Sequence, residues 1–230
     1  MRLAGYQPLT LIDYPGHLAA IIFTQGCPFR CVYCHNPDLL PIVGANELPI
    51  DEVLAHLKKD QAMLNGVVVT GGEPTLHPDL PDFLLQLKSL GLHVKLDTNG
   101  VNPRLVEKCL ALGLVDFVAM DIKHRWEKYQ DIIGSTPDIV IDNCKKTLAL
   151  IREFGVAHEF RTTVYSQLHT VDDILTIAGY LQAGESYALQ PVRGGVTLQP
   201  NLPLGEPLDL FDLKQDITSA FPYLQVEIKN

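Results

Sequence analysis

Apolar residues recur along this chain at two alternating spacings. Short runs rich in β-branched and other apolar residues predict six buried strands, at 18–23, 67–70, 93–97, 115–122, 158–164 and 186–190. Between these runs, apolar residues recur at helical spacing, which predicts helices at about 51–64, 79–90, 103–112, 126–133, 138–154 and 171–182. The pattern therefore predicts strands that alternate with helices.

Such an alternation forms parallel β-α units with right-handed crossovers. Eight units close a barrel of about 250 residues, whereas six leave a curved sheet that is open on one side. We therefore predict an α/β fold with a partial (β/α)6 barrel over residues 18–193. An extended segment at 1–17 should precede it, and an extension at 194–230 should carry a helix near 208–220 and a short strand at 224–228.

The composition favours one globular domain over residues 1–230, because 47% of the residues are hydrophobic and a chain of this length buries an ample core. No apolar run reaches the roughly 18 residues that cross a bilayer, and the N-terminus lacks the layout of a signal peptide. We therefore expect a cytoplasmic protein. The net charge of −9 and the lack of a basic cluster argue against a nucleic-acid partner, since phosphate binding depends on lysine and arginine.

Three of the five cysteines, Cys27, Cys31 and Cys34, follow the first predicted strand with the spacing C-x3-C-x2-C. Clustered cysteines fit a reducing compartment and metal ligation better than disulfides. Cys109 and Cys144 stand singly in helical segments, where we expect small buried hydrophobes. Three thiolates can hold three corners of a [4Fe–4S] cluster, which normally has four cysteine ligands. One iron would then be open to a ligand that is not protein.

A zinc site is the alternative for this loop, with His35 as the fourth ligand beside the three cysteines. Zinc favours four cysteine or histidine ligands, usually in two separated pairs. Cys34 and His35 are adjacent, and adjacent residues are poorly placed to bind one ion together. This geometry favours the iron–sulfur interpretation.

Polar motifs also end the next three predicted strands. They are Gly71-Gly72-Glu73-Pro74, Asp97-Thr98-Asn99-Gly100 and Asp121-Ile122-Lys123. By itself, each has a plain structural explanation: a tight turn, an Asx-type turn and an exposed ion pair. Sites in parallel α/β folds form at the carboxyl ends of strands, however. We therefore expect these motifs and the cysteine loop to build one site.

The cysteine motif, with Tyr33 before its last cysteine, resembles that of the radical S-adenosylmethionine (SAM) enzymes. Its flanks narrow the resemblance, since the lead Leu-Ile-Asp-Tyr-Pro-Gly at 11–16 and the tail Cys-His-Asn-Pro at 34–37 are similar to activating enzymes of glycyl-radical proteins. They are most similar to the activating proteins of anaerobic ribonucleoside-triphosphate reductase. The similarity covers most of the chain and is densest up to about Lys123.

The resemblance implies a role for each matching residue near the cluster. Cys27, Cys31 and Cys34 would ligate the cluster, and the amine and carboxylate of SAM would chelate the open iron. Tyr33 and His35 flank the last ligand, where the family packs adenine and lines the site. The residues that would receive the SAM amino group are Gly71, Gly72 and Glu73; the glycines allow close backbone approach.

Further matches lie at the later strand ends. Asp97, Thr98 and Asp121 match residues that help to bind a small cation near the methionyl end of SAM in pyruvate formate-lyase activating enzyme. Lys123 matches a lysine that pairs with the SAM carboxylate, and Arg161 matches an arginine of that relative. Two further matches are Arg193, where that relative has a histidine, and Asp13, which corresponds to a residue near the entering peptide.

The reaction that the resemblance implies is cleavage of SAM by a reduced cluster, followed by removal of a hydrogen atom from a glycine of the partner enzyme. The electron would come from a low-potential donor such as flavodoxin. The cofactors supply this chemistry, so no side chain is expected to act as a general acid or base. Two alternatives stay open: a radical SAM enzyme that acts on a small molecule, as in deazapurine biosynthesis, and a zinc-binding interaction module.

Overall fold

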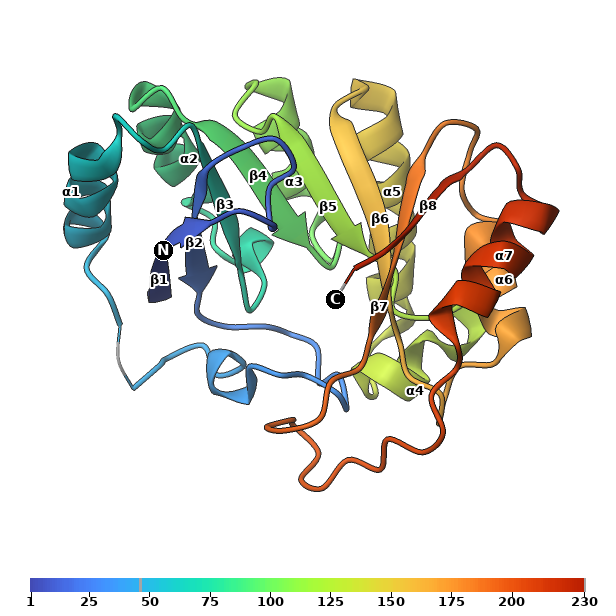
Figure 1. Ribbon diagram of the computed structural model, residues 1–230. Coiled ribbons are helices and arrows are strands. Elements are labelled where there is room, and N and C mark those ends of the chain that lie inside the picture. Colours follow the sequence, from blue (N-terminus) through green and yellow to red (C-terminus); the bar gives the residue numbers. More distant parts are fainter. Residues whose placement is uncertain (46, 230) are drawn as a thin grey trace. The chain divides into compact units, whose positions relative to one another are not determined.

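The computed structural model describes residues 1–45 and 47–229 (Figure 1). The chain forms two compact units. The first contains Met1–Pro28, Asp38–Ala119 and Asp142–Ala157, and the second contains Phe29–Pro37, Met120–Ile141 and His158–Asn230. We describe each unit by itself. No helix within the described residues combines the length and the apolar character needed to cross a membrane.

Four strands of the first unit lie side by side in chain order: β1 (Leu3–Thr10), β2 (Ala19–Thr24), β3 (Gly66–Gly71) and β4 (His93–Thr98). Strands β2, β3 and β4 are parallel, as predicted. Strand β1 runs antiparallel to β2. The sequence predicted only an extended segment here because β1 has no apolar run: only its two end residues, Leu3 and Thr10, are buried.

The helices of the first unit are α1 (Ile50–Asp60), α2 (Leu80–Ser89), α3 (Pro103–Ala111), the 3₁₀ turn η2 (Pro74–Leu76) and most of α5 (Asp138–Phe154). A further 3₁₀ turn, η1 (Pro37–Leu39), crosses the boundary between the units. Helix α3 begins with Pro103 after the Asn102 cap, whose side chain accepts from the Leu105 N–H, and such caps fix where a helix starts. The 3₁₀ turns were not predicted, since such short turns carry no periodicity.

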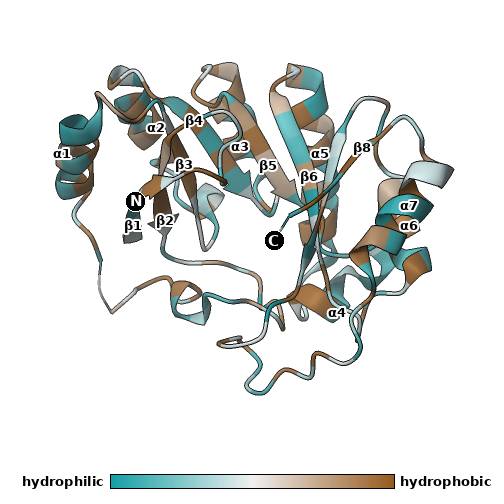
Figure 2. Cartoon of the chain, in the orientation of Figure 1, coloured by the Kyte–Doolittle hydropathy of each residue, from teal (hydrophilic) through white to brown (hydrophobic). Residues whose placement is uncertain are grey.

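The core of the first unit is formed by the two central strands, which Figure 2 shows as strongly hydrophobic. Residues 67–69 of β3 and 19–22 of β2 are all buried. On one face, Tyr14, Ala19, Ile21 and Val68 form a cluster. Burial on both faces explains why these strands are continuous apolar runs rather than alternating ones.

The second unit has three parallel strands in chain order: β6 (Ala157–Val164), β7 (Ser186–Pro191) and β8 (Gln225–Ile228). Its helices are η3 (Trp126–Lys128), α4 (Tyr129–Ile133), α6 (Val171–Ala178) and α7 (Leu210–Ala220). Helix α6 starts with a capping box between Thr170 and Asp173, which satisfies two backbone N–H groups of its first turn. Strand β8 corresponds to the final strand predicted at 224–228, and it pairs with β7.

Strand β5 (Phe117–Asp121) crosses the boundary between the units. In neither unit does the last strand pair with the first, so the strands do not close into a barrel. The predicted α/β class and the open sheet are thus confirmed. The six predicted strands correspond to β2 to β7; in addition, β1 lies beside β2 in the first unit and β8 lies beside β7 in the second.

Candidate active site at the carboxyl ends of the strands

The cysteine loop follows the carboxyl end of β2 and passes from the first unit, which holds Cys27, to the second, which holds Cys31 and Cys34. None of the three is in a disulfide. Across the described ranges, no three cysteine, histidine or acidic side chains are placed to hold a single metal ion. A [4Fe–4S] cluster binds its cysteines through different irons, so its ligands need not meet at one point. Three cysteines on one loop, none of them in a disulfide, fit such a cluster.

Backbone hydrogen bonds fix each end of this loop within its own unit. In the first unit, the N–H groups of Gly26 and Cys27 donate to the carbonyls of Leu39 and Leu40, at 2.7 and 3.2 Å. In the second, Leu198 N–H donates to the Cys34 carbonyl at 2.9 Å. The thiols are therefore presented by an ordered backbone.

Gly71 and Gly72, at the carboxyl end of β3, contact the backbone at the start of the cysteine loop. A Cβ on Gly72 would lie 2.2 Å from the Gly26 carbonyl oxygen, and Gly71 has a φ of +117°. No other residue type fits such contacts without displacement of the backbone. The Gly72 and Glu73 N–H groups donate to the carbonyls of Thr24 and Gly26, at 2.9 and 2.8 Å. The glycines thus join two loops directly.

Glu73 is buried, with 1% of its surface exposed. Its Oε1 accepts hydrogen bonds from the Thr75 N–H and hydroxyl and from the Thr98 hydroxyl, and its Oε2 accepts from the Asn99 N–H at 2.7 Å. Burial raises the pKa of Glu73, and these four hydrogen bonds oppose the rise. The carboxylate therefore ties the loop after β3 to the loop after β4.

Asp97 and Thr98 take different partners at the end of β4. Asp97 pairs with Lys95 at 2.7 Å, whereas the Thr98 hydroxyl binds Glu73 and accepts from the Gly100 N–H at 3.0 Å. Lys95 is buried, with 1% of its surface exposed, and was not among the predicted site residues. The signal was present, since a lysine two residues before Asp97 in a strand points to the same face.

In the second unit, Asp121 lies between two cations. Its carboxylate accepts from Arg161 at 2.8 Å and from Lys123 at 2.7 Å. Burial by itself raises the pKa of Asp121, but the Arg161 guanidinium and the Lys123 ammonium outweigh it and hold that pKa well below its ordinary value. The pKa of Lys123 is raised in turn, because the attraction of Asp121 outweighs the effect of burial. The predicted group of Asp121, Lys123 and Arg161 is therefore a compact ion cluster with one net positive charge.

We expect Asp121→Asn to reduce the free energy of unfolding at pH 7 by about 2 kcal/mol, because two largely buried cations lose their charged hydrogen-bond acceptor. A depressed carboxylate pKa contributes stability above the ordinary value of about 3.9 and loses it as the pH falls through the folded-state pKa. The difference from the parent should therefore shrink between about pH 4 and pH 2. Urea unfolding of the metal-free chain at several pH values, with Asp142→Asn as an exposed control, measures it. A difference that stays constant with pH would contradict the ion cluster's role.

Behind Lys123 lies a pair of buried histidines, His124 and His169, whose ring centroids are 4.5 Å apart. His169 accepts the Tyr165 N–H at Nδ1, at 3.0 Å, and its Nε2 lies 2.9 Å from the Lys123 carbonyl, so Nε2 carries the proton. Burial lowers the pKa of His169 to about 4. Burial also lowers the pKa of His124. Both rings are therefore neutral at pH 7, and His169 holds the backbone carbonyl of Lys123. Sequence patterns did not predict it.

The second part of the cysteine loop contains Cys31, which is 8% exposed, and Tyr33, which is 3% exposed. Burial raises the pKa of the Cys31 thiol to about 11, although the nearby charge of the Lys123 ammonium lowers it in part. The Tyr33 ring packs edge-on against Tyr165, with centroids 6.2 Å apart. Among the described residues, no partner binds the buried Tyr33 hydroxyl. An orphaned polar atom beside the cysteines fits a loop that receives a ligand.

His35 and Arg193 are exposed and lie together in the second unit. The His35 ring is 3.4 Å from the Val196 carbonyl through Nδ1 and accepts the Arg193 N–H through Nε2 at 3.4 Å. These long contacts connect the cysteine loop to the segment after β7. Arg193 takes part in this contact through its backbone N–H and not through its guanidinium.

Asp13 lies apart from the other predicted residues of the first unit. It follows β1, and Thr10 at the end of β1 pairs with Ala19, the first residue of β2. The Thr10 hydroxyl donates to the Asp13 carboxylate. Asp13 is thus exposed near the amino end of β2, whereas the cysteine loop follows its carboxyl end.

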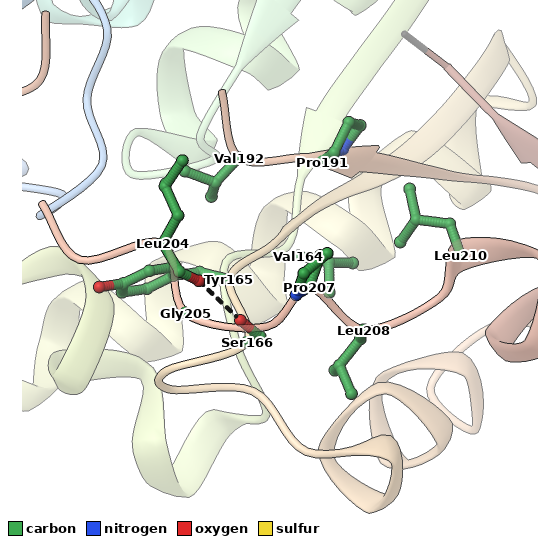
Figure 3. A pocket seen from close by; sticks show the side chains of 10 residues that line it. All are labelled: Val164, Tyr165, Ser166, Pro191, Val192, Leu204, Gly205, Pro207, Leu208 and Leu210. Atoms are coloured by element: carbon green, nitrogen blue, oxygen red, sulfur yellow. Dashed lines mark hydrogen bonds between the residues drawn. The ribbon is translucent and has the colours of Figure 1, made fainter. Parts of the chain in front are cut away.

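A small apolar pocket of about 250 Å³ lies in the second unit (Figure 3), after the ends of β6 and β7. Val164, Pro191 and Leu210 contribute to its wall. One side is formed by the segment near Leu204, whose carbonyl accepts from the Ser166 hydroxyl at 3.0 Å. Pockets that hold whole drug-sized ligands measure about 300–1,000 Å³, so this one suits a single ring or side chain.

Comparison with known proteins identifies the class. The model of the radical SAM superfamily matches residues 21–182, which is more than half of the chain. The chain therefore belongs to the radical SAM superfamily. A solved structure of Streptococcus suis SuiB bound to S-adenosylmethionine aligns with 90% of this chain and 48% of that one, at a TM-score of 0.69 and 14% identity. A radical SAM methyltransferase from Sphaerobacter thermophilus aligns with 96% and 69%, at a TM-score of 0.69 and 14% identity; both show the fold alone.

Two relatives narrow the class of radical SAM protein. A Methanocaldococcus jannaschii protein, provisionally named a glycyl-radical enzyme activating enzyme, is 31% identical over 191 residues, 82% of this chain and 78% of that protein. Pyruvate formate-lyase-activating enzyme of Clostridium pasteurianum is 37% identical over 128 residues, 54% of this chain and 52% of that enzyme. The chain thus spans about half of the latter. The predicted activating-enzyme type of radical SAM protein is confirmed, and family membership implies a [4Fe–4S] cluster and SAM.

Proposed function

We propose that this chain activates a glycyl-radical enzyme, and that the partner is the anaerobic ribonucleoside-triphosphate reductase. The observation that carries the activating role is the loop of three cysteines outside any disulfide, in a chain of which 82% aligns with a relative named for this activity. When bound, the cluster and SAM supply the electron and the carbon radical that remove a hydrogen atom from the partner's glycine. We expect this chemistry to take place in the reducing cytoplasm.

The choice of reductase rests on the flanks of the cysteine loop, the lead at 11–16 and the tail at 34–37. The chain has no further cysteine cluster that would hold a second iron–sulfur centre, since Cys109 and Cys144 stand singly. The relatives named for pyruvate formate-lyase make that enzyme the natural competitor. We propose a flavodoxin-type protein as the electron donor.

For the cluster, we assign Cys27, Cys31 and Cys34 as ligands. None of them is in a disulfide, and a thiolate is the form that ligates iron. Metal binding releases the thiol protons, so the high pKa of Cys31 is no barrier to ligation. Tyr33 and His35 flank the last ligand, and we assign them to the wall of the SAM site.

For SAM, we assign its amino group to the backbone of the loop that contains Gly71 and Gly72. The Glu73 carboxylate already accepts four hydrogen bonds, so Glu73 would act by holding this loop. We assign the SAM carboxylate to Lys123 and Arg161, whose two charges exceed that of Asp121. Such charge-assisted contacts are about twice as strong as neutral ones.

Three assignments remain predictions. A small cation near Asp97 and Asp121 is not required for charge balance, because each carboxylate has a cationic partner. The Thr98 hydroxyl donates to Glu73, so a cation would have to bind the lone pairs of the same hydroxyl oxygen. We retain Arg193 as a SAM contact and Asp13 as a contact to the partner's peptide on the strength of the resemblance alone.

Lys123→Ala should weaken SAM binding about tenfold, or about 1.4 kcal/mol, while the cluster stays intact. The lysine supplies one of the two charges offered to the SAM carboxylate, and Arg161 stays behind. Calorimetric titration of the anaerobically reconstituted protein with SAM measures the change. Lys145→Ala, on the exposed face of α5, is the matched control. An affinity equal to that of the parent would remove Lys123 from the SAM site.

The proposed partner is tested by electron paramagnetic resonance. Reconstituted protein, SAM and a reductant are mixed with either the anaerobic reductase or pyruvate formate-lyase. We expect the doublet of a glycyl radical with the reductase and none with the lyase. A doublet with the lyase alone would move the proposal to that partner. No doublet with either would favour the small-molecule alternative.

A further inference from the structure

We propose that Asn99 positions the cluster and raises its reduction potential, by donating a hydrogen bond from its side-chain amide to the sulfur of Cys27. This inference deepens the proposed function and rests on it, because it assumes that Cys27 is a cluster ligand. The Asn99 Nδ2 lies 3.7 Å from the Cys27 Sγ, within the range of N–H···S hydrogen bonds. Both residues belong to the first unit.

The orientation of the Asn99 amide follows from its other end. The Oδ1 atom accepts the Val101 N–H at 3.0 Å. An amide nitrogen cannot accept that hydrogen bond, so oxygen must face Val101 and nitrogen must face the sulfur. The side chain is buried, with 6% of the residue's surface exposed. A donor is therefore aimed at the sulfur where water competes little.

The backbone of Asn99 is held on both sides. Its N–H donates to the Glu73 Oε2 at 2.7 Å, and its carbonyl accepts from the Cys144 thiol at 3.3 Å. One residue later, the Gly100 carbonyl accepts from the Thr147 hydroxyl at 2.7 Å. Glu73 on one side and α5 on the other thus fix the position of the amide. Cys144 was expected to be a plain buried hydrophobe, and this contact gives its thiol a specific partner.

Hydrogen bonds to the sulfurs are among the factors that set the potential of an iron–sulfur cluster. A donor at sulfur stabilises the extra negative charge of the reduced cluster more than it stabilises the oxidised one. Asn99 has no charge of its own, so its effect is directional and local. Its removal should make the cluster harder to reduce.

The test compares the parent with Asn99→Ala and Asn99→Asp. The aspartate keeps an oxygen for the Val101 N–H, loses the donor and adds a negative charge. Asn143→Ala is the matched control, since the Asn143 amide binds the Val101 carbonyl of the same loop at 3.1 Å and is not among the donors to sulfur. Anaerobic redox titration of the reconstituted cluster, followed by electron paramagnetic resonance, gives the midpoint potential of each.

At the parent's midpoint potential, we expect the ratio of reduced to oxidised cluster to fall about tenfold in Asn99→Ala, a shift of about 59 mV for a one-electron couple. Asn99→Asp should shift further in the same direction, and Asn143→Ala should match the parent. The iron–sulfur stretching bands in resonance Raman spectra should move in the two Asn99 variants only. Unchanged potentials and bands in both would overturn the inference, whereas a parent that assembles no [4Fe–4S] cluster would overturn the proposed function.

Discussion

The Cys31→Ala variant is expected to retain no [4Fe–4S] cluster and no measurable SAM cleavage. A cube that already lacks one of its usual four cysteine ligands cannot stay bound by the two remaining thiols. Cys31 is also the most buried of the three ligands, so no water-borne ligand would readily replace it. Iron content, the brown colour of the anaerobically reconstituted protein and the yield of 5′-deoxyadenosine measure the loss.

Cys109→Ala is the matched control for this variant. Cys109 is fully buried in α3 and is not a proposed ligand, so its removal should leave iron content and SAM cleavage unchanged. If Cys31→Ala kept the iron complement and the activity of the parent, the assignment of the three cysteines would be wrong.

The second large effect is expected for Glu73→Ala, which should lower the free energy of unfolding by about 3 kcal/mol. The substitution leaves the hydrogen-bond donors of Thr75, Thr98 and Asn99 buried without an acceptor, and each such group costs about 1–3 kcal/mol. Some of these groups will find water in the space that is left, so the sum is not reached. Urea unfolding of the metal-free chain measures the change.

Glu47→Ala is the control, because Glu47 is exposed and pairs with the exposed Arg2, so its removal should change the free energy of unfolding by less than about 0.5 kcal/mol. Glu73→Gln keeps the shape and replaces one acceptor by a donor, so it should also destabilise. A stability equal to the parent's in both Glu73 variants would show that the two loops are not held together by this carboxylate.

Much of the fold could be predicted from the apolar pattern, because β2 to β7 and α5 are long or strongly apolar. Two helices end earlier than predicted: α1 at Asp60 and α6 at Ala178. In each case an apolar residue beyond the helix, Leu64 or Leu181, is still buried. The spacing of apolar residues indicates which residues are buried. Because burial continues into the turn after the last helical hydrogen bond, this spacing places the helix end too late.

The strand-end motifs were also visible in the sequence, since Gly, Asp and Cys residues stand out after apolar runs. What could not be predicted were contacts between residues far apart in the chain. The buried state of Glu73, the amide of Asn99 beside Cys27 and the support of Lys123 by His169 depend on loops that meet only in the folded chain. Spacing identifies candidate residues, and only the fold shows which atoms they use.

The central claim is that three cysteines hold a [4Fe–4S] cluster whose open iron binds SAM. It is tested most directly by anaerobic reconstitution, followed by assay of metal, sulfide and SAM products in one sample. We predict about four irons and four sulfides per chain, and equal amounts of 5′-deoxyadenosine and methionine once a reductant is added. A colourless protein that holds zinc without sulfide and leaves SAM intact would contradict the account.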